Sequence, residues 1–211
     1  MAMLPSLASA ASPSDTVDGL MRPATLPRAI IFDLDATLWS PELFEIAGRP
    51  FRRVLTKGRG KKGLTAAHTV VDRRGTPIGL FSDARHVLEE LATDRRWEGV
   101  VLGLASRTDC VEDAHELLEV IQITPTHTMA DLFPRHVRQI FPGSKRAHFQ
   151  RLHEITGIPY REMAFWDDWD LNCRDVSRLG VYCCHVPEGL TLSRWEKALD
   201  GFARRKEEEG W

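Results

Sequence analysis

Two aspartates two residues apart follow a short apolar run near the start of the chain. Asp33 and Asp35 come directly after Ala29–Phe32, and an apolar run of this length predicts a buried strand. Because side chains alternate along a strand, both carboxyl groups would leave it on the same side. Carboxylates this close cannot both stay ionised near neutral pH unless a cation offsets their repulsion or one keeps its proton. The pair therefore predicts either an ionised nucleophile beside a proton donor, or a polar strand end that only caps a helix.

Polar side chains suited to phosphate follow two further apolar runs and begin a later helix. They are Ser106 after Val100–Ala105, Lys145 at a predicted helix start, and Asp167 with Asp168 after Met163–Trp166. A hydroxyl and an ammonium group can stabilise the oxygens of a transferring phosphoryl group, and paired carboxylates supply the hard oxygens that magnesium prefers. Taken singly, each is more often a helix-start or solvated surface residue. Their common placement at strand ends favours a phosphate site.

The elements that must position these side chains alternate between strand and helix. Besides the three strands above, strands are predicted over 137–141 and 181–186. Helices are predicted over 83–95, after a capping box formed by Asp109 and Glu112, and over 144–156 with Ile155 inward. A further helix is predicted to end at Leu179, and a last one to begin at Leu192 with that residue inward. This alternation implies an α/β fold: a mainly parallel sheet with helices on both faces. Ligands bind beyond the carboxyl ends of such strands. Helix N-termini after Thr37 and Thr108 are expected to add donors for anions.

An irregular insertion over about 40–81 separates the first strand from the first long helix. It lacks a repeated helical pattern, which predicts a small flap rather than a large cap domain. The insertion carries a basic run without an intervening acid: Arg49, Arg52, Arg53, Lys57, Arg59, Lys61 and Lys62. This run would either steer anionic substrates or form a solvated loop. A nucleotide-binding P-loop is excluded because Leu64 stands where that motif needs lysine.

Length and composition indicate one globular domain with a sizeable core. The 211 residues carry a net charge of −2, which gives no case for nucleic acid or membrane partners. Four cysteines without a Cys-x-x-Cys pair indicate free thiols in a reducing compartment, and none starts the Cys-x5-Arg motif of cysteine phosphatases. The predicted organisation is a disordered leader over 1–27, a catalytic domain over 28–206 and a charged tail over 207–211. A cytoplasmic location is expected, with organelle targeting by the leader as the alternative.

Longer motifs carry a family resemblance. The Asp-x-Asp-x-Thr motif of Asp33 to Thr37 resembles motif I of the haloacid dehalogenase (HAD) superfamily, and further strings across 29–192 are similar to its magnesium-dependent phosphatases. These strings are Ala-Ser-Arg-Thr at 105–108, Phe-Pro-Gly-Ser-Lys-x-x-His-Phe-x-x-Leu at 141–152, Thr-Gly-Ile-Pro at 156–159, Asp-Asp-x-x-x-Asn at 167–172, and Leu-Gly-Val at 179–181. The resemblance implies a HAD-like Rossmannoid three-layer fold.

The resemblance also implies a role for each site residue. Asp33 would be the nucleophile and Asp35 the acid and base, while Ser106 and Lys145 would hold the phosphoryl oxygens. Mg²⁺ would sit on Asp33, the Asp35 carbonyl and Asp168, with Asp167 close by. Arg107 would contact substrate or form a structural ion pair. The sequence departs from the family at Ala36, where a bulky residue or glycine is usual, and at Trp169, where an acid is usual.

The predicted function is a magnesium-dependent phosphomonoester hydrolase that works through an aspartyl-phosphate. Its substrate would be a phosphoprotein carrying phosphotyrosine or a small sugar phosphate. Two alternatives remain from the sequence. A phosphotransferase or mutase on the same scaffold would need a cap to exclude water. A catalytically silent binding module would use the basic run to engage partners.

Overall fold

The computed structural model describes residues 16–17, 20–21, 25–54 and 69–211. The predicted leader falls mostly outside this part of the chain, and its described pieces, β1 (Thr16–Val17) and β2 (Leu20–Met21), pair antiparallel. Lys57, Arg59, Lys61 and Lys62 of the basic run also lie outside the described residues, as does the P-loop-like segment. No helix in the described part is long and apolar enough to cross a bilayer.

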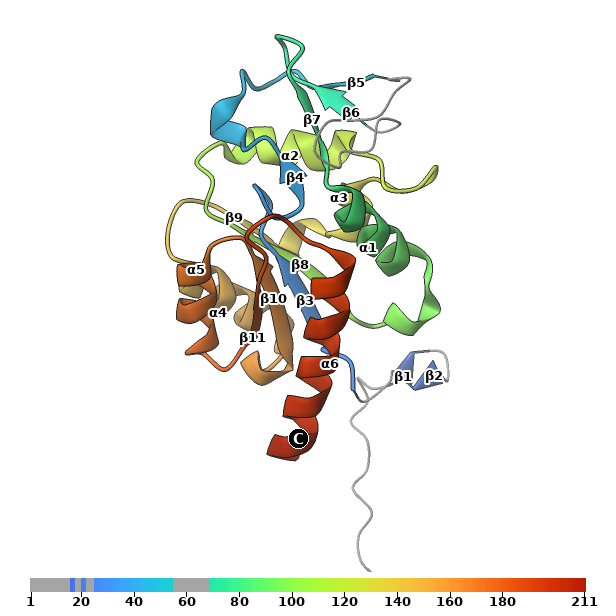
Figure 1. The fold of residues 1–211 in the computed structure, drawn as a ribbon, viewed down its shortest axis with the longest axis vertical. Helices are drawn as coiled ribbons and strands as arrows, with labels where there is room; N and C mark the ends of the chain where they lie inside the picture. Colours follow the sequence, from blue (N-terminus) through green and yellow to red (C-terminus); the bar gives the residue numbers. More distant parts are fainter. Residues whose placement is uncertain (1–15, 18–19, 22–24, 55–68) are drawn as a thin grey trace, which may run out of the picture.

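A five-stranded parallel sheet forms the centre of the molecule (Figure 1). Its strands, in spatial order, are β11 (Tyr182–His185), β10 (Met163–Asp167), β3 (Ala29–Phe32), β8 (Val101–Ser106) and β9 (Arg138–Ile140). β3 lies in the middle and all four of its residues are buried, as expected for a strand covered on both faces. The predicted parallel α/β fold is confirmed.

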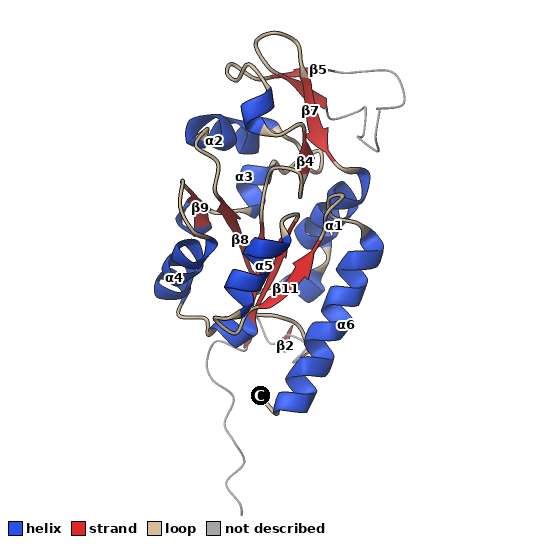
Figure 2. Cartoon of the chain, turned by 60° about the vertical axis from the view of Figure 1, so that its left-hand side comes forward, coloured by secondary structure: helices blue, strands red, loops and turns tan. Residues whose placement is uncertain are grey.

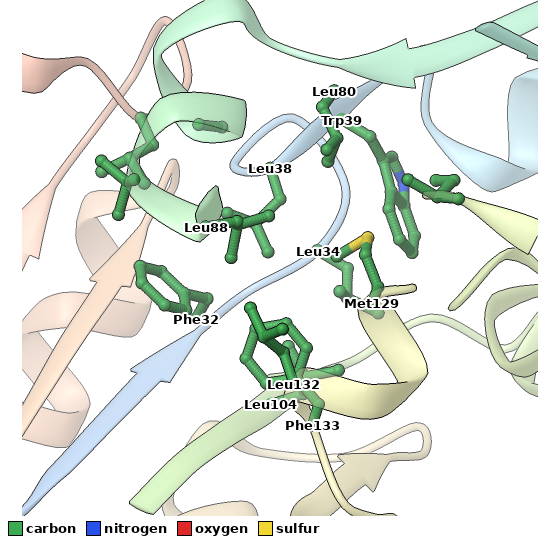
Figure 3. Close-up of a cluster of buried hydrophobic side chains, with 14 of the residues drawn as sticks. Phe32, Leu34, Leu38, Trp39, Leu80, Leu88, Leu104, Met129, Leu132 and Phe133 are labelled. Carbon is green, nitrogen blue, oxygen red and sulfur yellow. The ribbon is translucent and has the colours of Figure 1, made fainter. Parts of the chain in front are cut away.

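Helices cover both faces of the sheet (Figure 2). One face packs against α4 (Lys145–Thr156) and α5 (Asp170–Ser177); the other packs against α1 (Ser82–Thr93), α2 (Val111–Val120), α3 (Met129–Leu132) and α6 (Leu192–Glu209). Residues of β3 alternate between the two cores, because Ile31 belongs to the cluster with Phe149 of α4, whereas Phe32 belongs to the cluster with Trp195 of α6. Figure 3 shows Phe32 among Leu104, Phe133 and their neighbours in the second cluster.

The insertion after β3 forms an antiparallel β-flap above the carboxyl ends of the central strands (Figure 1). Its strands are β4 (Trp39–Ser40), β7 (Pro77–Leu80), β6 (Thr69–Val71) and β5 (Arg52–Val54), in that spatial order, with a short 3₁₀ helix over Leu43–Glu45. The described residues of the insertion therefore form a small flap. Its strands were not predicted, because two to four residues are too few to establish an alternating pattern.

Arg49 and Arg53, two of the three described residues of the basic run, hold the flap against α2. Arg49 contacts Glu112 at 2.8 Å and Asp113 at 2.9 Å. Arg53 donates to the carbonyl oxygen of Val120 at 2.8 Å, and the amide of Phe51 donates to Glu116 at 2.8 Å. Arg49 and Arg53 are therefore used for packing the flap and do not form a free electropositive surface.

Two predicted helix starts near the strand ends are wrong. No helix follows Thr37, since the chain turns back into β4 within two residues. α2 begins at Val111, and its N-cap residue Cys110 makes no capping hydrogen bond, so Asp109 and Glu112 form no capping box. Thr108 instead accepts a hydrogen bond from the Cys110 amide at 3.2 Å. The N-cap of α2 is thus Cys110, one residue later than the predicted Asp109.

Three expectations about apolar and terminal residues also differ from the structure. Ile155 is 48% exposed and Leu192 is 37% exposed, and both lie at the ends of their helices. The chain over 207–211 is not a separate tail, since α6 continues to Glu209. Trp211 then packs against Phe202 with ring centroids 5.8 Å apart. The ring contact holds Trp211 against α6.

Candidate active site

A cleft of about 560 Å³ opens at the carboxyl ends of β3, β8 and β10, beneath the flap. It is lined by Asp33, Asp35, Glu42, Phe44, Ser106, Arg107, Thr108, Asp109, Pro142, Lys145, Asp168, Trp169 and Asn172. The sequence therefore anticipated the side chains at the strand ends. It did not identify Glu42 and Phe44, which arrive from the flap.

Lys145 forms the centre of a buried ion network at the floor of the cleft. Its ammonium nitrogen lies 2.6 Å from Asp33 Oδ1 and 2.9 Å from Asp167 Oδ2, and it donates to the Ala105 carbonyl oxygen at 2.5 Å. Ser144 caps α4 by accepting a hydrogen bond from the Ala147 amide, and so places Lys145 at the first helical position. Although burial alone would lower the pKa of Lys145, the two carboxylates raise it, so this lysine stays charged.

Asp33 is a carboxyl group balanced between two protonation states. Burial raises its pKa from 3.8 to about 7, against the attraction of Lys145, and the nearby Asp167 adds to the rise. A further cation close to Asp33 would favour its ionised form, because an opposite charge lowers the pKa of a carboxyl group. A cation bound beside Asp33 would therefore stabilise its carboxylate form.

Carboxylate oxygens of Asp33, Asp167 and Asp168 lie within 4.8 Å of one another. Hard oxygen ligands of this kind fit Mg²⁺, which needs few protein ligands because it keeps several waters. Asp168 is held by Thr37, whose hydroxyl oxygen accepts from the Asp168 amide at 3.0 Å and lies 3.4 Å from Asp168 Oδ1. Burial raises the pKa of Asp168, with Asp167 as a second cause, so a cation would stabilise its charged form. Among the described residues, the carboxylate of Asp35 does not belong to this group.

Asp167 differs from its two neighbours because its oxygens are already occupied. Oδ1 accepts from the Trp169 amide at 2.8 Å and from Asn172 Nδ2 at 3.0 Å. Oδ2 accepts from Asn172 at 3.1 Å and faces Lys145. Asp33 and Asp168 are thus the better candidates for direct metal ligands, while Asp167 fixes Lys145.

Asp35 is oriented by residues of the flap. Its Oδ1 accepts a hydrogen bond from Trp39 Nε1 at 2.7 Å and another from the Leu43 amide at 3.1 Å. Burial raises the pKa of Asp35, which outweighs the opposing effect of these bonds and suits a group that must donate a proton. Trp39 stands four residues after Asp35 in the sequence, but no motif marked it as a site residue.

Ser106 and Arg107, at the end of β8, add a hydroxyl group and a guanidinium group to the lining of the cleft. Ser106 is buried at the end of β8. Arg107 donates to Asn172 Oδ1 at 3.3 Å, and its guanidinium carbon lies 5.3 Å from the centre of the Trp169 ring. Among the described residues Arg107 forms no ion pair, so the alternative of a structural ion pair finds no support. Arg107 is one of the residues that line the cleft.

Proteins of known family resemble this chain over most of its length. The sequence profile of the acid phosphatase family matches residues 25–205. Human magnesium-dependent phosphatase 1 is 38% identical over 182 residues, covering 86% of this chain and 90% of that protein. A HAD-like hydrolase superfamily protein of Schizosaccharomyces pombe is 34% identical, covering 74% of this chain and 83% of the relative.

A solved structure agrees on the fold. The phosphatase domain of a Bacteroides fragilis protein, crystallised with Mg, superposes with a TM-score of 0.59 at 17% identity, covering 84% of this chain and 41% of that one. At this identity the likeness supports the fold alone. The family profile and the two sequence relatives carry the assignment further: the chain belongs to the acid phosphatase family and, within the HAD superfamily, to the magnesium-dependent phosphatases.

Proposed function

We propose that this phosphatase hydrolyses phosphomonoesters through an aspartyl-phosphate formed on Asp33. The observation that carries the proposal is the buried network in which Asp33 contacts Lys145. Carboxylate oxygens of Asp33 and Asp168 also lie close enough to bind one metal ion. A Mg²⁺ ion held by Asp33 and Asp168 would offset the charge of the nucleophile and of the phosphate that approaches it.

The proposed reaction has two steps, and the positions of the side chains support a role for each of them. An oxygen of Asp33 attacks phosphorus, and the bond from phosphorus to the leaving oxygen breaks while Asp35 gives that oxygen its proton. Lys145 and the Ser106 hydroxyl stabilise charge on the equatorial oxygens. Asp35, now ionised, takes a proton from water as the water attacks phosphorus, and the bonding electrons return to Asp33. Both carboxyl groups end in their starting states.

The described flap favours hydrolysis over a mutase, and the buried ion network favours it over a silent binding module. A mutase must exclude water and hold a second acceptor, whereas the described flap consists of short antiparallel strands and one 3₁₀ turn. A silent binding module would not need a buried lysine held between two carboxylates beside a third. Each of these features costs desolvation energy that a simple binding surface has no reason to sustain.

Metal removal tests the proposal. Hydrolysis of an aryl phosphate should fall at least about 100-fold in EDTA and return with Mg²⁺, since electrostatic stabilisation by a metal is worth several kcal/mol. Ca²⁺ should inhibit, because its longer bonds and higher coordination number would misplace the nucleophile. In quenched wild-type enzyme, mass spectrometry should find a phosphoryl group on the peptide that contains Asp33. Hydrolysis that is unaffected by EDTA would refute the proposal.

The side chains at the rim of the cleft indicate which class of phosphomonoester the site prefers. Phe44 is 70% exposed and Trp169 is 52% exposed, and both line the cleft from different elements. Glu42 and Asp109 line the same rim and would repel a second negative charge on the substrate. Aromatic side chains gain free energy when a flat apolar group covers them. We therefore expect aryl phosphomonoesters, including phosphotyrosine on proteins, to be preferred over sugar phosphates.

Truncating the aromatic rim should separate the two substrate classes. Phe44→Ala should raise KM for an aryl phosphate by about 3- to 10-fold and leave glycerol phosphate nearly unchanged, because an aromatic contact contributes about 0.5–1.5 kcal/mol. Trp169→Ala should act in the same direction, although it also removes the face on which Arg107 stacks. Leu171→Ala is the matched control, since Leu171 is 51% exposed but does not line the cleft. Equal KM changes for both substrates would contradict an aryl preference.

A further inference from the structure

We infer that Trp39 is the positioning residue that decides which oxygen of Asp35 carries the catalytic proton. The inference rests on the proposed function, in which Asp35 is the acid and base. The indole N–H of Trp39 and the amide of Leu43 both donate to Oδ1 of Asp35, at 2.7 Å and 3.1 Å. Within the described part of the chain, no donor is within hydrogen-bond distance of Oδ2.

Two N–H donors on one oxygen constrain where the proton can sit. An oxygen that accepts two hydrogen bonds in the protonated acid must be the carbonyl oxygen, because a hydroxyl hydrogen there would compete with the donors. The proton therefore resides on Oδ2, the oxygen left free beside the cleft that Asp35 lines. The two bonds also fix the rotation of the carboxyl group, so Oδ2 is held ready for the leaving oxygen.

The fold holds Trp39 itself in place. Its side chain is fully buried and lies beside Leu80 in the core beneath the flap (Figure 3). In the backbone, Trp39 pairs with Leu80 of β7, and its carbonyl oxygen accepts from the Ala36 amide at 3.0 Å. The second donor, Leu43, begins the 3₁₀ helix that also carries Phe44 into the cleft. One short segment of the flap, residues 39–44, therefore both orients Asp35 and contributes Phe44 to the rim of the cleft.

The proton transfer balances with this assignment. The proton on Oδ2 passes to the leaving oxygen as the bond from phosphorus to that oxygen breaks, and Asp35 becomes a carboxylate. The hydrogen bond from Trp39 to Oδ1 strengthens at this stage, because bonds to an ionised acceptor are stronger than bonds to a neutral one. In the second step water returns a proton to Oδ2. Trp39 therefore stabilises the carboxylate formed in the first half-reaction and keeps Oδ2 in position for the second, without touching the substrate.

The test is the dependence of rate on the leaving group. In Trp39→Phe, kcat/KM for a poor leaving group such as glycerol phosphate should fall by about 100-fold, within the range that general acid catalysis contributes. For 2,4-dinitrophenyl phosphate, which departs without a proton, kcat/KM should fall no more than about 3-fold. Because kcat/KM reports steps up to formation of the phospho-enzyme, the hydrolysis step common to all esters does not obscure the comparison.

Trp97→Phe is the matched control. Trp97 is buried in the same core cluster, and its indole N–H donates to Glu90 at 2.9 Å, so its removal costs a similar bond away from the cleft. Its leaving-group dependence should equal that of the wild type. If Trp39→Phe does not fold, benzothienylalanine at position 39 replaces only the N–H with sulfur and keeps the ring shape.

The outcomes separate the inference from the proposed function. A uniform loss across all esters, or no loss, would overturn the positioning role of Trp39 while leaving the phosphatase mechanism intact. Absence of phosphoryl transfer to Asp33 in the wild-type enzyme would instead overturn the mechanism on which the inference rests.

Discussion

Replacing Asp33 with Asn is expected to lower phosphatase activity by about 10⁴-fold or more, the scale seen when a catalytic nucleophile is removed. An amide cannot form the acyl-phosphate, and it removes one of the two best oxygen ligands for Mg²⁺. Lys145 would still be held by Asp167 at 2.9 Å, so the floor of the cleft should persist. The measurement is kcat/KM on an aryl phosphate at saturating Mg²⁺, together with a search for phosphoryl transfer to the Asp33 peptide.

Asp170→Asn is the control for this experiment. Asp170 is an acid two residues beyond Asp168, but it pairs with Arg174 on the surface of α5 and does not line the cleft. Its activity should stay within about 2-fold of the wild type, as for most surface substitutions. If Asp33→Asn kept activity within 10-fold of wild type, the covalent mechanism would be wrong and Asp33 would serve only as a metal ligand.

Replacing Lys145 with Met should damage both stability and activity. The ammonium group lies between two buried carboxylates, so its loss leaves their charges uncompensated, which typically costs about 3–5 kcal/mol. In EDTA this corresponds to a fall in Tm of about 6–20 °C for a chain of this size. Activity should fall by about 100- to 1000-fold, because the charge on the transferring phosphoryl group loses a fixed donor.

The loss of stability in Lys145→Met should depend on pH and on metal. The pKa of Asp33 is already raised from 3.8 to about 7, and removing Lys145 raises it further. A raised carboxyl pKa means that the folded state binds more protons than the unfolded state, so stability falls as pH rises above about 4. The defect should therefore be larger at pH 8 than at pH 5, and Mg²⁺ should restore part of it.

Arg146→Met provides the comparison for Lys145→Met. Arg146 is the next residue of the same helix and is exposed, so its loss should change stability by less than about 0.5 kcal/mol. Thermal unfolding of both variants in EDTA, at two pH values, measures the difference. Equal stability of the two variants would mean that the buried network does not need its central cation.

Some parts of the site follow from the sequence because strand ends in a parallel sheet converge. Asp33, Ser106 and Asp168 each stand at or just beyond the end of an apolar run, and those runs became β3, β8 and β10. Continuous apolar strands are buried on both faces of the sheet. Polar side chains that follow them therefore remain accessible at the edge formed by the carboxyl ends of the strands. Lys145 could be added because Ser144 and Gly157 define both ends of its helix.

Other parts of the site depend on how the flap folds back over the sheet. Trp39 and Leu43 reach Asp35, and Phe44 reaches the rim, because β4 pairs with β7 more than thirty residues later in the chain. Arg49 and Arg53 are fixed on α2 by contacts that no local pattern encodes.

The sequence by itself thus determined the parallel sheet, the strand-end acids and the lysine, through hydrophobic periodicity and helix capping, which act over a few residues. The tertiary structure alone decided which groups orient Asp35, what forms the rim, and where the basic residues of the flap are used. The physical reason is that such contacts depend on long-range closure of short strands, whose two to four residues carry too little periodicity to specify their partners.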